Sequence, residues 1–411
     1  MQMVAIIGAG PAGMLAASQA ARLGAKVILL EQNERLGKKL VITGKGRCNV
    51  TNNSDTDTLV KNMPGNGRFL YSALTAFGSQ DLQAFLQSHG VELKVERGNR
   101  VFPCSDRSFD IVDGLRLALE RNNVEVRLRS RVSQLIMEKG RVAGLIVNEQ
   151  PLNANAVIIC TGGASYPATG STGDGYRLAA AAGHTIIPPR AALVPLETAE
   201  TWPRTLQGLA LKNVQLTVSQ AERVLAKEFG ELLFTHYGIS GPIVLSLSRW
   251  VTHSKQGQPV IASINLKPAL TEEQLDKRLQ RDLLKYQRKE IKNSLDDLLP
   301  KRLIPIVITM AGLEENKPAH QITRLERQQL VRALTDLRVT ISGTRPLTEA
   351  IVTAGGVSTK EIDPKTMQSR LVPGLYFAGE VIDVDGFTGG FNLQAAFSTG
   401  YLAGQSAAKQ E

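Results

Sequence analysis

The stretch MVAIIGAGPAG, residues 3–13, decides the fold class of this chain. Residues 3–8 form a continuous apolar run, which is typical of a buried strand in a parallel sheet. Three glycines follow in the spacing G-x-G-x-x-G, namely Gly8, Gly10 and Gly13. A segment of helical composition occupies 14–24, and a second apolar strand, KVILLE, occupies 26–31. This order predicts a Rossmann-like dinucleotide-binding unit at the start of the chain.

The glycines of this motif each have a physical role. Gly8 permits a tight turn, Gly10 lets the backbone approach a pyrophosphate, and Gly13 lets the helix pack closely on the strand. The N-terminus of the helix that follows offers free N–H groups and the positive end of its dipole to phosphates. Pro11 and Ala12 are also expected at the cofactor. We therefore expect this turn to bind a dinucleotide. A glycine-rich turn in another kind of α/β protein is the alternative.

An acidic residue, Glu31, ends the second strand about twenty residues after the motif. A carboxylate at this position can accept hydrogen bonds from a ribose 2′-OH, which favours FAD or NAD over NADP. Gln32 follows directly, and we expect both side chains to lie at the cofactor.

The next segment, GKKLVITGKGRCNVTN, spans 37–52 and is too rich in glycine for a helix and too charged for a core strand. It can lay backbone N–H groups and cations along a dinucleotide as long as FAD. Arg47 can neutralise a phosphate or stabilise an anionic flavin, and Asn49 and Asn52 can hydrogen-bond ring or ribityl groups. The expected cofactor residues here are Lys38, Lys39, Gly46, Arg47, Cys48 and Asn49. A solvated loop is the alternative.

Five motifs together resemble the BaiN/RdsA-type family of FAD-dependent oxidoreductases, the HI0933-like flavoproteins. They are GAGPAG, GKKLVITGKGRCNVTN, CTGGASYPATGSTGDGY, GELLFTHYGISGP and FAGEVIDVDGFTGGFNLQAAFSTG, in the family's order over essentially the whole chain. The resemblance implies an α/β fold in which a Rossmann-like FAD domain of the two-dinucleotide-binding type is interrupted by a β-barrel-like domain with a helical insert.

The corresponding domain boundaries follow from changes in the sequence pattern. The FAD domain is expected at 1–190 and 345–411, the barrel-like domain at 191–266 and 335–344, and the helical insert at 267–334. In the insert, Leu275, Leu279, Leu283 and Leu284 fall near helical spacing and are expected in the core.

Two further segments are expected at the flavin. An apolar strand at 154–165 ends in a glycine pair, where backbone can pass close to the cofactor. The segment 374–404 reads as a strand, a loop and a helix whose N-terminus can stabilise negative charge on reduced flavin. The alternative for 154–165 is a strand that ends in an ordinary turn, and the alternative for 374–404 is a C-terminal helix that only covers the sheet. The resemblance adds the backbone of Val132 at the adenine and the first turn of the last helix at the ring. The candidate residues are Val132, Thr161, Gly162, Gly163, Gly379, Glu380, Asp385, Gly390, Phe391, Asn392, Leu393 and Gln394.

Composition narrows the class of protein. With 411 residues, 43% of them hydrophobic and 21% charged, the chain has the composition of an ordinary globular protein of two or three domains. No apolar run is long enough to span a bilayer, and no secretory signal is evident. The three cysteines are widely spaced and histidines number five, so we expect no metal site, no membrane association and a reducing cytoplasm. The oligomeric state cannot be inferred.

The net charge of +10, with a pI of about 9.5, leaves two interpretations open. One is a solvated basic surface or a site for anionic cofactors, and the other is a nucleic-acid substrate. The Lys- and Arg-rich helical insert fits either a solvated face or a surface that contacts phosphates.

Two residues are candidates for proton transfer. His236, in GELLFTHYGISGP, can act as a general acid or a substrate donor, or it can bond a nearby backbone group structurally. Cys104 lies between Arg100 and Arg107, which can lower the pKa of its thiol, and an inert thiol is the alternative.

The resemblance implies reduction of an activated C=C bond by FAD, with NAD(P)H as a transient electron donor. Two substrate classes are linked with the family: a uracil base of large-subunit ribosomal RNA, which becomes dihydrouridine, and a steroid-like or bile-acid-like enone. The basic charge and the low aromatic content of 5% favour RNA. A flavin-bearing RNA-binding or assembly protein without turnover is a third hypothesis.

Overall fold

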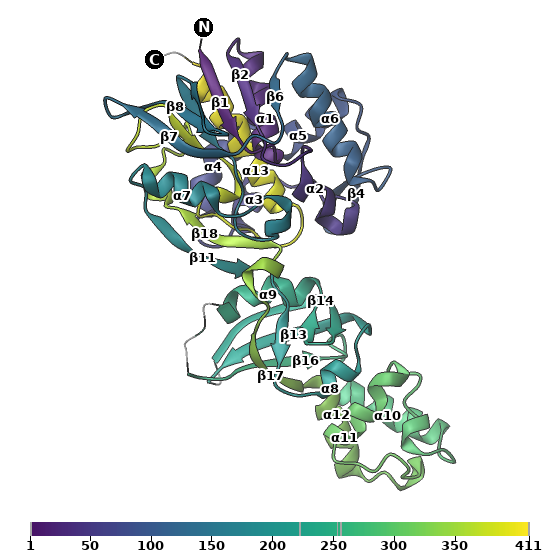
Figure 1. The fold of residues 1–411 in the computed structure, drawn as a ribbon. Helices are drawn as coiled ribbons and strands as arrows, with labels where there is room; N and C mark the ends of the chain where they lie inside the picture. Colours follow the sequence, from purple (N-terminus) through teal and green to yellow (C-terminus); the bar gives the residue numbers. More distant parts are fainter. Residues whose placement is uncertain (1, 222, 253, 255–256, 410–411) are drawn as a thin grey trace. The chain divides into compact units, whose positions relative to one another are not determined.

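The computed structural model describes residues 2–221, 223–252, 254 and 257–409. The chain divides into two compact units (Figure 1). The first comprises Met1–Ala192 and Leu347–Glu411, and the second is Leu193–Pro346. Each unit has a hydrophobic core of its own.

The first unit is built on a five-stranded sheet in the order β19-β10-β1-β2-β6. Its strands are β1 (Met3–Ile7), β2 (Lys26–Leu30), β6 (Glu125–Arg127), β10 (Ala156–Ile159) and β19 (Leu375–Phe377). All four neighbouring pairs are parallel. The predicted Rossmann-like unit is therefore confirmed, and the last strand comes from the far end of the chain.

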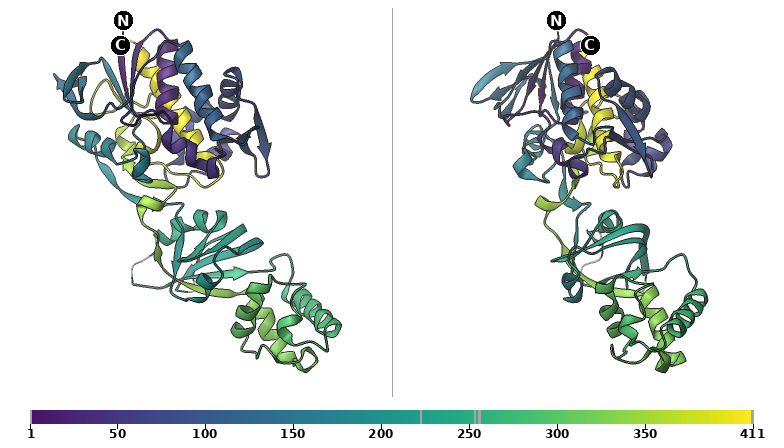
Figure 2. Two further views of the ribbon diagram at one scale, coloured as in Figure 1. Left: turned by 45° about the vertical axis from the view of Figure 1, so that its right-hand side comes forward. Right: turned by 90° about the vertical axis from the view of Figure 1, so that its right-hand side faces the viewer.

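Two helices from opposite ends of the sequence cover this sheet side by side: α1 (Pro11–Arg22) and α13 (Phe391–Ala408) (Figures 1 and 2). A Cβ atom on Gly400 would lie 2.3 Å from the carbonyl oxygen of Ala12, and one on Gly404 would lie 2.3 Å from that of Ala16. Because residue numbers rise together along both helices, α1 and α13 run parallel, and their N-termini point the same way.

Smaller elements complete the first unit. A three-stranded sheet is formed by β3 (Thr51–Asn52), β5 (Arg100–Pro103) and β4 (Leu93–Glu96). A second one contains β7 (Val132–Glu138), β8 (Arg141–Val147) and β9 (Gln150–Asn153). The strands β11 (Ile186–Ala192) and β18 (Val352–Val357) pair antiparallel. The remaining helices are α2 (Lys38–Ile42), α3 (Thr56–Lys61), α4 (Tyr71–Ala76), α5 (Ser79–Ser88), α6 (Ser108–Arg121) and α7 (Asp174–Ala181).

The second unit contains a closed barrel in the order β12-β15-β14-β13-β16-β17. Its strands are β12 (Leu196–Thr198), β13 (Ala210–Gln220), β14 (Arg223–Thr235), β15 (Gly238–Ser240), β16 (Val260–Asn265) and β17 (Leu337–Thr344). Two helices, α8 (Trp202–Thr205) and α9 (Pro242–Thr252), belong to this part. The barrel predicted from the resemblance is therefore confirmed.

A helical segment is inserted between β16 and β17, as the resemblance implied. It contains α10 (Glu272–Lys285), α11 (Ile304–Met310) and α12 (Arg324–Thr335). Capping boxes at Thr271 and Thr323 begin α10 and α12, because each threonine accepts a bond from the residue three positions on, whose side chain bonds back. The insert and the barrel share one core.

The leucines of α10 follow the predicted stripe with one exception. Leu275, Leu279 and Leu283 are buried, but Leu284 is 69% exposed. The prediction for Leu284 is wrong because a helix turns about 100° per residue, which carries residue 284 away from the buried face.

A buried histidine joins the end of α7 to the segment before β19. The Nε2 atom of His184 lies 2.8 Å from Ser369 Oγ, and Nδ1 lies 3.2 Å from the Glu361 carboxylate. Ser369 Oγ also accepts the N–H groups of Leu371 and Val372, so its hydroxyl proton points to His184. The imidazole side chain has no exposed area, and its burial lowers the pKa despite the opposing charge of Glu361.

We expect the free energy of unfolding to fall as the pH drops below about 6.5, the ordinary pKa of histidine. The reason is that the unfolded chain then takes up a proton that the buried His184 does not. Urea unfolding of the wild type and of His184→Gln, compared from about pH 8 to pH 5, measures the pH-dependent contribution of His184 to the free energy of unfolding. The wild type should lose more stability than the variant over this pH range. Equal losses in the two proteins would show that His184 is not the cause of the pH dependence.

We also expect Gly404→Ala to lower the free energy of unfolding by about 1–3 kcal/mol, although alanine is the better helix former. The new Cβ would meet the rigid backbone oxygen of Ala16. Gly114→Ala in α6 is the matched control, because its Cβ would meet a side-chain methyl of Val91 instead of a backbone oxygen. Urea unfolding should show the larger loss for Gly404→Ala, and the reverse order would show that the helix contact is not tight.

Candidate functional site

The three glycines of the turn between β1 and α1 differ in how much space surrounds them. Gly8 has a φ of +99°, and a Cβ there would lie 2.6 Å from the carbonyl oxygen of Cys160. A Cβ on Gly13 would lie 1.8 Å from the carbonyl oxygen of Gly8. A Cβ on Gly10 would meet no atom within 4 Å. Two of the glycines are therefore required for packing, while the third leaves open space over the N-terminus of α1, beside Pro11 and Ala12.

The Glu31 carboxylate is held at this turn. It is 7% exposed, and one oxygen accepts the N–H of Ala9 at 2.8 Å. The other oxygen accepts the backbone N–H of Asn33 at 2.9 Å and its side-chain amide at 2.7 Å. Gln32 donates to the carbonyl oxygen of Gly170 at 2.7 Å. These bonds fix the end of β2 beside the glycine turn, where the prediction places a ribose.

Lys39 joins three segments that are far apart in sequence. Its Nζ atom donates to Ser165 Oγ at 2.7 Å and to the Glu380 carboxylate at 2.8 Å. The other oxygen of Glu380 accepts the N–H of Thr353 at 2.7 Å. Neighbouring Lys38 instead lies 3.3 Å from Asn33 Oδ1. The predicted cofactor residues Lys39 and Glu380 are therefore brought together as an ion pair.

Arg47 lies in a different environment from the predicted one. Its guanidinium pairs with the carboxylates of Glu96 and Asp106 and lies 4.2 Å from the centre of the Phe102 ring. Lys94 shares Asp106 at 2.8 Å. In the structure these ion pairs tie the Arg47 side chain to the β3-β5-β4 sheet, and its contact with the cofactor stays a prediction.

The residues after Arg47 turn inward. Cys48 is completely buried, and burial raises the pKa of its thiol to about 12, with a hydrogen bond to Thr43 opposing the shift. Asn49 Oδ1 is buried, and no hydrogen-bond partner is found for it in the described chain. A Cβ on Gly46 would meet no atom within 4 Å. Asn49 therefore offers an acceptor to a ligand, whereas the Cys48 thiol does not.

The strand β10 leads to a second unpartnered polar atom. Thr161 Oγ1 is buried without a partner among the described residues, close to where a Cβ of Gly175 would lie. Gly162 has a φ of +73°, and a Cβ on Gly163 would lie 2.4 Å from Thr353 Oγ1. Val132 is buried at the start of β7. The backbone thus passes too close to its neighbours here for any side chain at 163.

The C-terminal segment meets the N-terminal unit at α13. A Cβ on Gly390 would lie 2.4 Å from the backbone of Thr51, and Asn52 donates to the carbonyl oxygen of Gly389 at 3.0 Å. A Cβ on Gly379 would lie 3.0 Å from that of Ala12. The ends of the chain therefore come together at the N-termini of α1 and α13.

The side chains of Asn392 and Gln394, in the first turn of α13, make hydrogen bonds within the protein. The Asn392 side chain bonds the backbone of Gly386 and Phe387 and so fixes the loop that follows Asp385. Gln394 has no exposed area, and its side chain bonds Thr51, Phe77 and Ser398.

The side chains of Asn392 and Gln394 are thus occupied within the protein. What this turn offers a ligand is the backbone N–H groups of Phe391, Asn392 and Leu393, since the first N–H groups of a helix lack partners in the helix.

The arrangement fits FAD. Gly400 lies level with Ala12, so α13 begins nine residues before this level and α1 begins one residue before it. At about 1.5 Å per residue, the N-terminus of α13 extends about 12 Å beyond that of α1. Both positive helix ends point to the carboxyl edge of the sheet, one suited to a pyrophosphate and one to an anionic ring. The unpartnered oxygens of Asn49 and Thr161 are further polar contacts for a ligand.

Sequence reasoning missed one buried hydroxyl near this site. The hydroxyl of Tyr176 is buried without a partner among the described residues, and burial raises its pKa, as do the charges of Glu380 and Asp383. The signal was present in the sequence, because Tyr176 ends the motif TGDGY, in the first turn of α7. It could not be separated from an ordinary core tyrosine without coordinates.

The two proton-donor candidates lie in different units. Cys104 is an exposed free thiol after β5 in the first unit. His236 is exposed in the turn between β14 and β15 of the second unit, with its ring 4.7 Å from that of Tyr237. The catalytic role of each stays a prediction.

Two other expectations concern metals and membranes. Within the described part of the chain, no group of three or more His, Cys, Asp or Glu side chains is arranged to hold a metal ion. Among the same residues, none of the helices combines the length and apolar character that a bilayer span requires.

Comparison with known proteins decides the family. The HI0933-like protein Rossmann domain family matches residues 2–406. The chain belongs to this family. It is 35% identical over 415 residues to the 3-dehydro-bile acid delta(4,6)-reductase of Clostridium scindens, with 100% of both chains covered. It is also 35% identical over 405 residues to the ribosomal RNA dihydrouridine synthase of Escherichia coli, covering 97% of this chain and 96% of that one.

A solved structure supports the fold. The 3-ketosteroid delta1-dehydrogenase from Sterolibacterium denitrificans superposes with a TM-score of 0.54 at 15% identity, covering 99% of this chain and 100% of that one. The predicted family and fold class are confirmed. Family membership and the geometry of the site together make the chain a flavin-dependent oxidoreductase with FAD as its cofactor.

We expect Gly10→Ala to abolish tight FAD binding while leaving the apoprotein as stable as the wild type. The new methyl would occupy the open space over α1, and the φ of −80° at this position suits alanine. Titration of the apoprotein with FAD, followed by flavin fluorescence, should show a loss of about a hundredfold or more.

Gly13→Ala is the contrasting variant, because its Cβ would meet the Gly8 carbonyl oxygen. It should destabilise the apoprotein in urea unfolding, whereas Gly10→Ala should not. Wild-type FAD affinity for Gly10→Ala would show that the pyrophosphate lies elsewhere.

Proposed function

We propose that the chain is an NAD(P)H-driven reductase of an activated C=C bond, and that its substrate is a uridine of 23S ribosomal RNA, which becomes dihydrouridine. The observation that carries the redox part is the pair of parallel helices α1 and α13, whose N-termini form an extended site for a flavin dinucleotide. When bound, FAD supplies two-electron transfer from the nicotinamide to the double bond.

The residues of the chain hold and orient this cofactor. The backbone N–H groups at the start of α1 would hold the pyrophosphate, and Glu31 would accept a hydrogen bond from the ribose. The N–H groups in the first turn of α13 would stabilise the negative charge that the flavin gains on reduction. The Lys39–Glu380 ion pair ties the loop after β2 to the loop after β19 and so fixes the walls of the site.

Completion of the reaction requires a proton at the carbon next to the substrate carbonyl. Cys104 and His236 are the two candidate donors.

Charge supports RNA as the substrate. The chain carries a net charge of +10, and the helical insert 267–334 holds 14 basic and 10 acidic residues. A base within RNA must be unstacked before it can reach a flavin, and a protein that grips the flanking phosphates can supply the energy for this. The full-length similarity to a ribosomal RNA dihydrouridine synthase agrees with this substrate.

A small-molecule enone reductase is the second candidate. The equally full-length similarity to a bile-acid reductase favours it, since both relatives are 35% identical to this chain. A steroid-like substrate would gain little from the net charge of +10. The two candidates share the flavin site and differ in what approaches it.

We expect 23S ribosomal RNA from cells that lack this protein to contain less dihydrouridine than RNA from the parent strain. Mass spectrometry of the nucleosides measures this, and the deficit should be restored by the wild-type gene but not by Gly10→Ala. Incubation of the deficient RNA with the holoprotein and NADPH should add two hydrogens to one uridine. Unchanged RNA, together with NADPH-dependent reduction of a steroid enone, would assign the second candidate instead.

A further inference from the structure

The helix α10 presents two contrasting faces. Its buried leucines point into the core of the second unit. Four polar residues repeat on the other side at positions i, i+3, i+4 and i+7, which is the spacing of one helix face. They are Gln274, Lys277, Arg278 and Arg281. The helix is therefore anchored by one face and exposes a strongly basic one, called here the α10 basic face.

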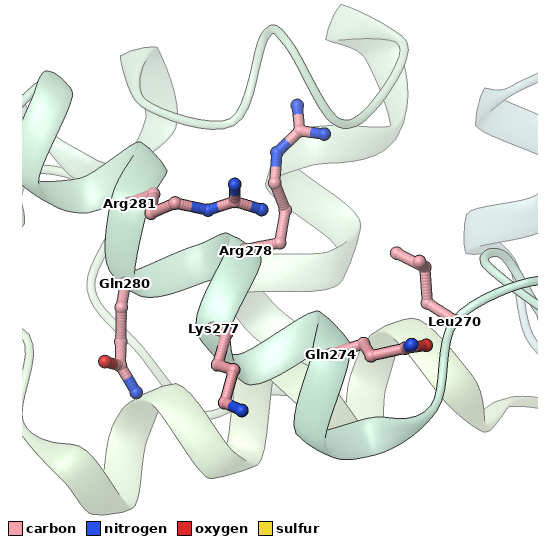
Figure 3. A pocket seen from close by; sticks show the side chains of 6 residues that line it. All are labelled: Leu270, Gln274, Lys277, Arg278, Gln280 and Arg281. Carbon is pink, nitrogen blue, oxygen red and sulfur yellow. The ribbon is translucent and has the colours of Figure 1, made fainter.

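This face borders a hollow of about 620 Å³ (Figure 3). Its lining consists of Leu270, Gln274, Lys277, Arg278, Gln280 and Arg281. Half of these side chains are cations and none is acidic. The hollow thus combines concave shape, positive charge, two amide side chains that both donate and accept hydrogen bonds, and one apolar side chain.

Two acidic residues of α10 form ion pairs, and one of these pairs takes up Arg278 of the α10 basic face. Asp276 is paired with Arg327 of α12 at 2.6 Å, and Gln280 donates to its other oxygen. The nearly buried Asp282 accepts from Arg278 at 2.8 Å. In the described part of the chain, Lys277 and Arg281 are exposed and have no carboxylate within ion-pair distance.

The cations near the start of α10 also repel one another. Lys267, just before the helix, has a lowered pKa because it is partly buried and because Arg278 is close. The positive charge of this region is thus in excess, and an anion would relieve it. Lys277 and Arg281 lie one turn apart, about 6 Å along the axis, so one polyanionic strand can contact both.

We propose that the α10 basic face binds the phosphate backbone of the RNA substrate. This inference rests on the proposed function, since it names the part of the chain that holds the RNA while a uridine is reduced. Arg281 and Arg278 suit phosphates because a guanidinium donates two parallel hydrogen bonds, and Lys277 adds a point charge. Gln274 and Gln280 suit the 2′-OH, which both donates and accepts. A phosphate strand with hydroxyls matches this set better than an acidic peptide does.

The test uses the FAD-loaded full-length protein and in vitro transcribed 23S ribosomal RNA. Removal of both charges in Lys277→Ala/Arg281→Ala should weaken RNA binding about tenfold or more near 100 mM salt. The slope of log affinity against log salt should become shallower by about 1.5, because two phosphate contacts are lost. FAD content and the rate of NADPH oxidation with an artificial electron acceptor should stay at wild-type values.

Lys360→Ala/Lys365→Ala is the matched control. Both lysines are exposed in the first unit, so the same net charge is removed away from the α10 basic face. Equal weakening in the control pair would show an effect of net charge alone and overturn the inference. Unchanged affinity and salt slope in Lys277→Ala/Arg281→Ala would overturn it as well, as would tighter binding of an acidic protein than of RNA at this face.

The inference and the proposed function fail in different ways. Wild-type protein that reduces uridine, with the alanine pair showing an unchanged KM for RNA, would remove the inference and leave the function. Wild-type protein that binds RNA through Lys277 and Arg281 but leaves uridine unreduced would support the inference and remove the function. Absence of RNA binding by the wild type would remove both.

Discussion

Direct backbone contact between α1 and α13 is the constraint on which the flavin site depends. Gly400 and Gly404 have no side chain, so α13 can rest on the carbonyl oxygens of Ala12 and Ala16. Larger side chains would push the helices apart and move the start of α13 away from Thr51, where Gly390 fits against the backbone. The position of the predicted ring-binding turn is thus fixed by two glycines about two and three turns further along the same helix.

Parallel packing brings two positive helix ends to the same edge of the sheet, each with about half an elementary charge. These ends are staggered along the helix axes, so a ligand with negative charge at two separate points would suit them. A pyrophosphate and a reduced flavin ring are two such points, and the glycines that permit the close packing set the distance between the two helix ends.

Sequence reasoning succeeded where a local pattern has one physical meaning. Three features predicted the parallel sheet: the apolar run before Gly8, the glycine spacing and the return of a C-terminal strand. Each of them can be recognised from residues that are adjacent in the sequence. The partners of individual side chains were not predicted. Gln394 bonds Thr51 and Phe77, more than 300 residues away in sequence, and no local pattern shows this. Arg47 was expected at the flavin, but carboxylates from the adjacent hairpin claim it.

These pairings change how the net charge of +10 must be explained. An anionic cofactor seemed sufficient to account for part of it, since Lys39 and Arg47 lie in the loop expected at the phosphates. In the folded chain Lys39 is neutralised by Glu380, and Arg47 is neutralised by Glu96 and Asp106. The helix N-termini proposed to hold the cofactor contribute nothing to formal charge. The excess of basic side chains is left for another partner, and Lys277 and Arg281 on α10 have the exposure that a polyanion requires.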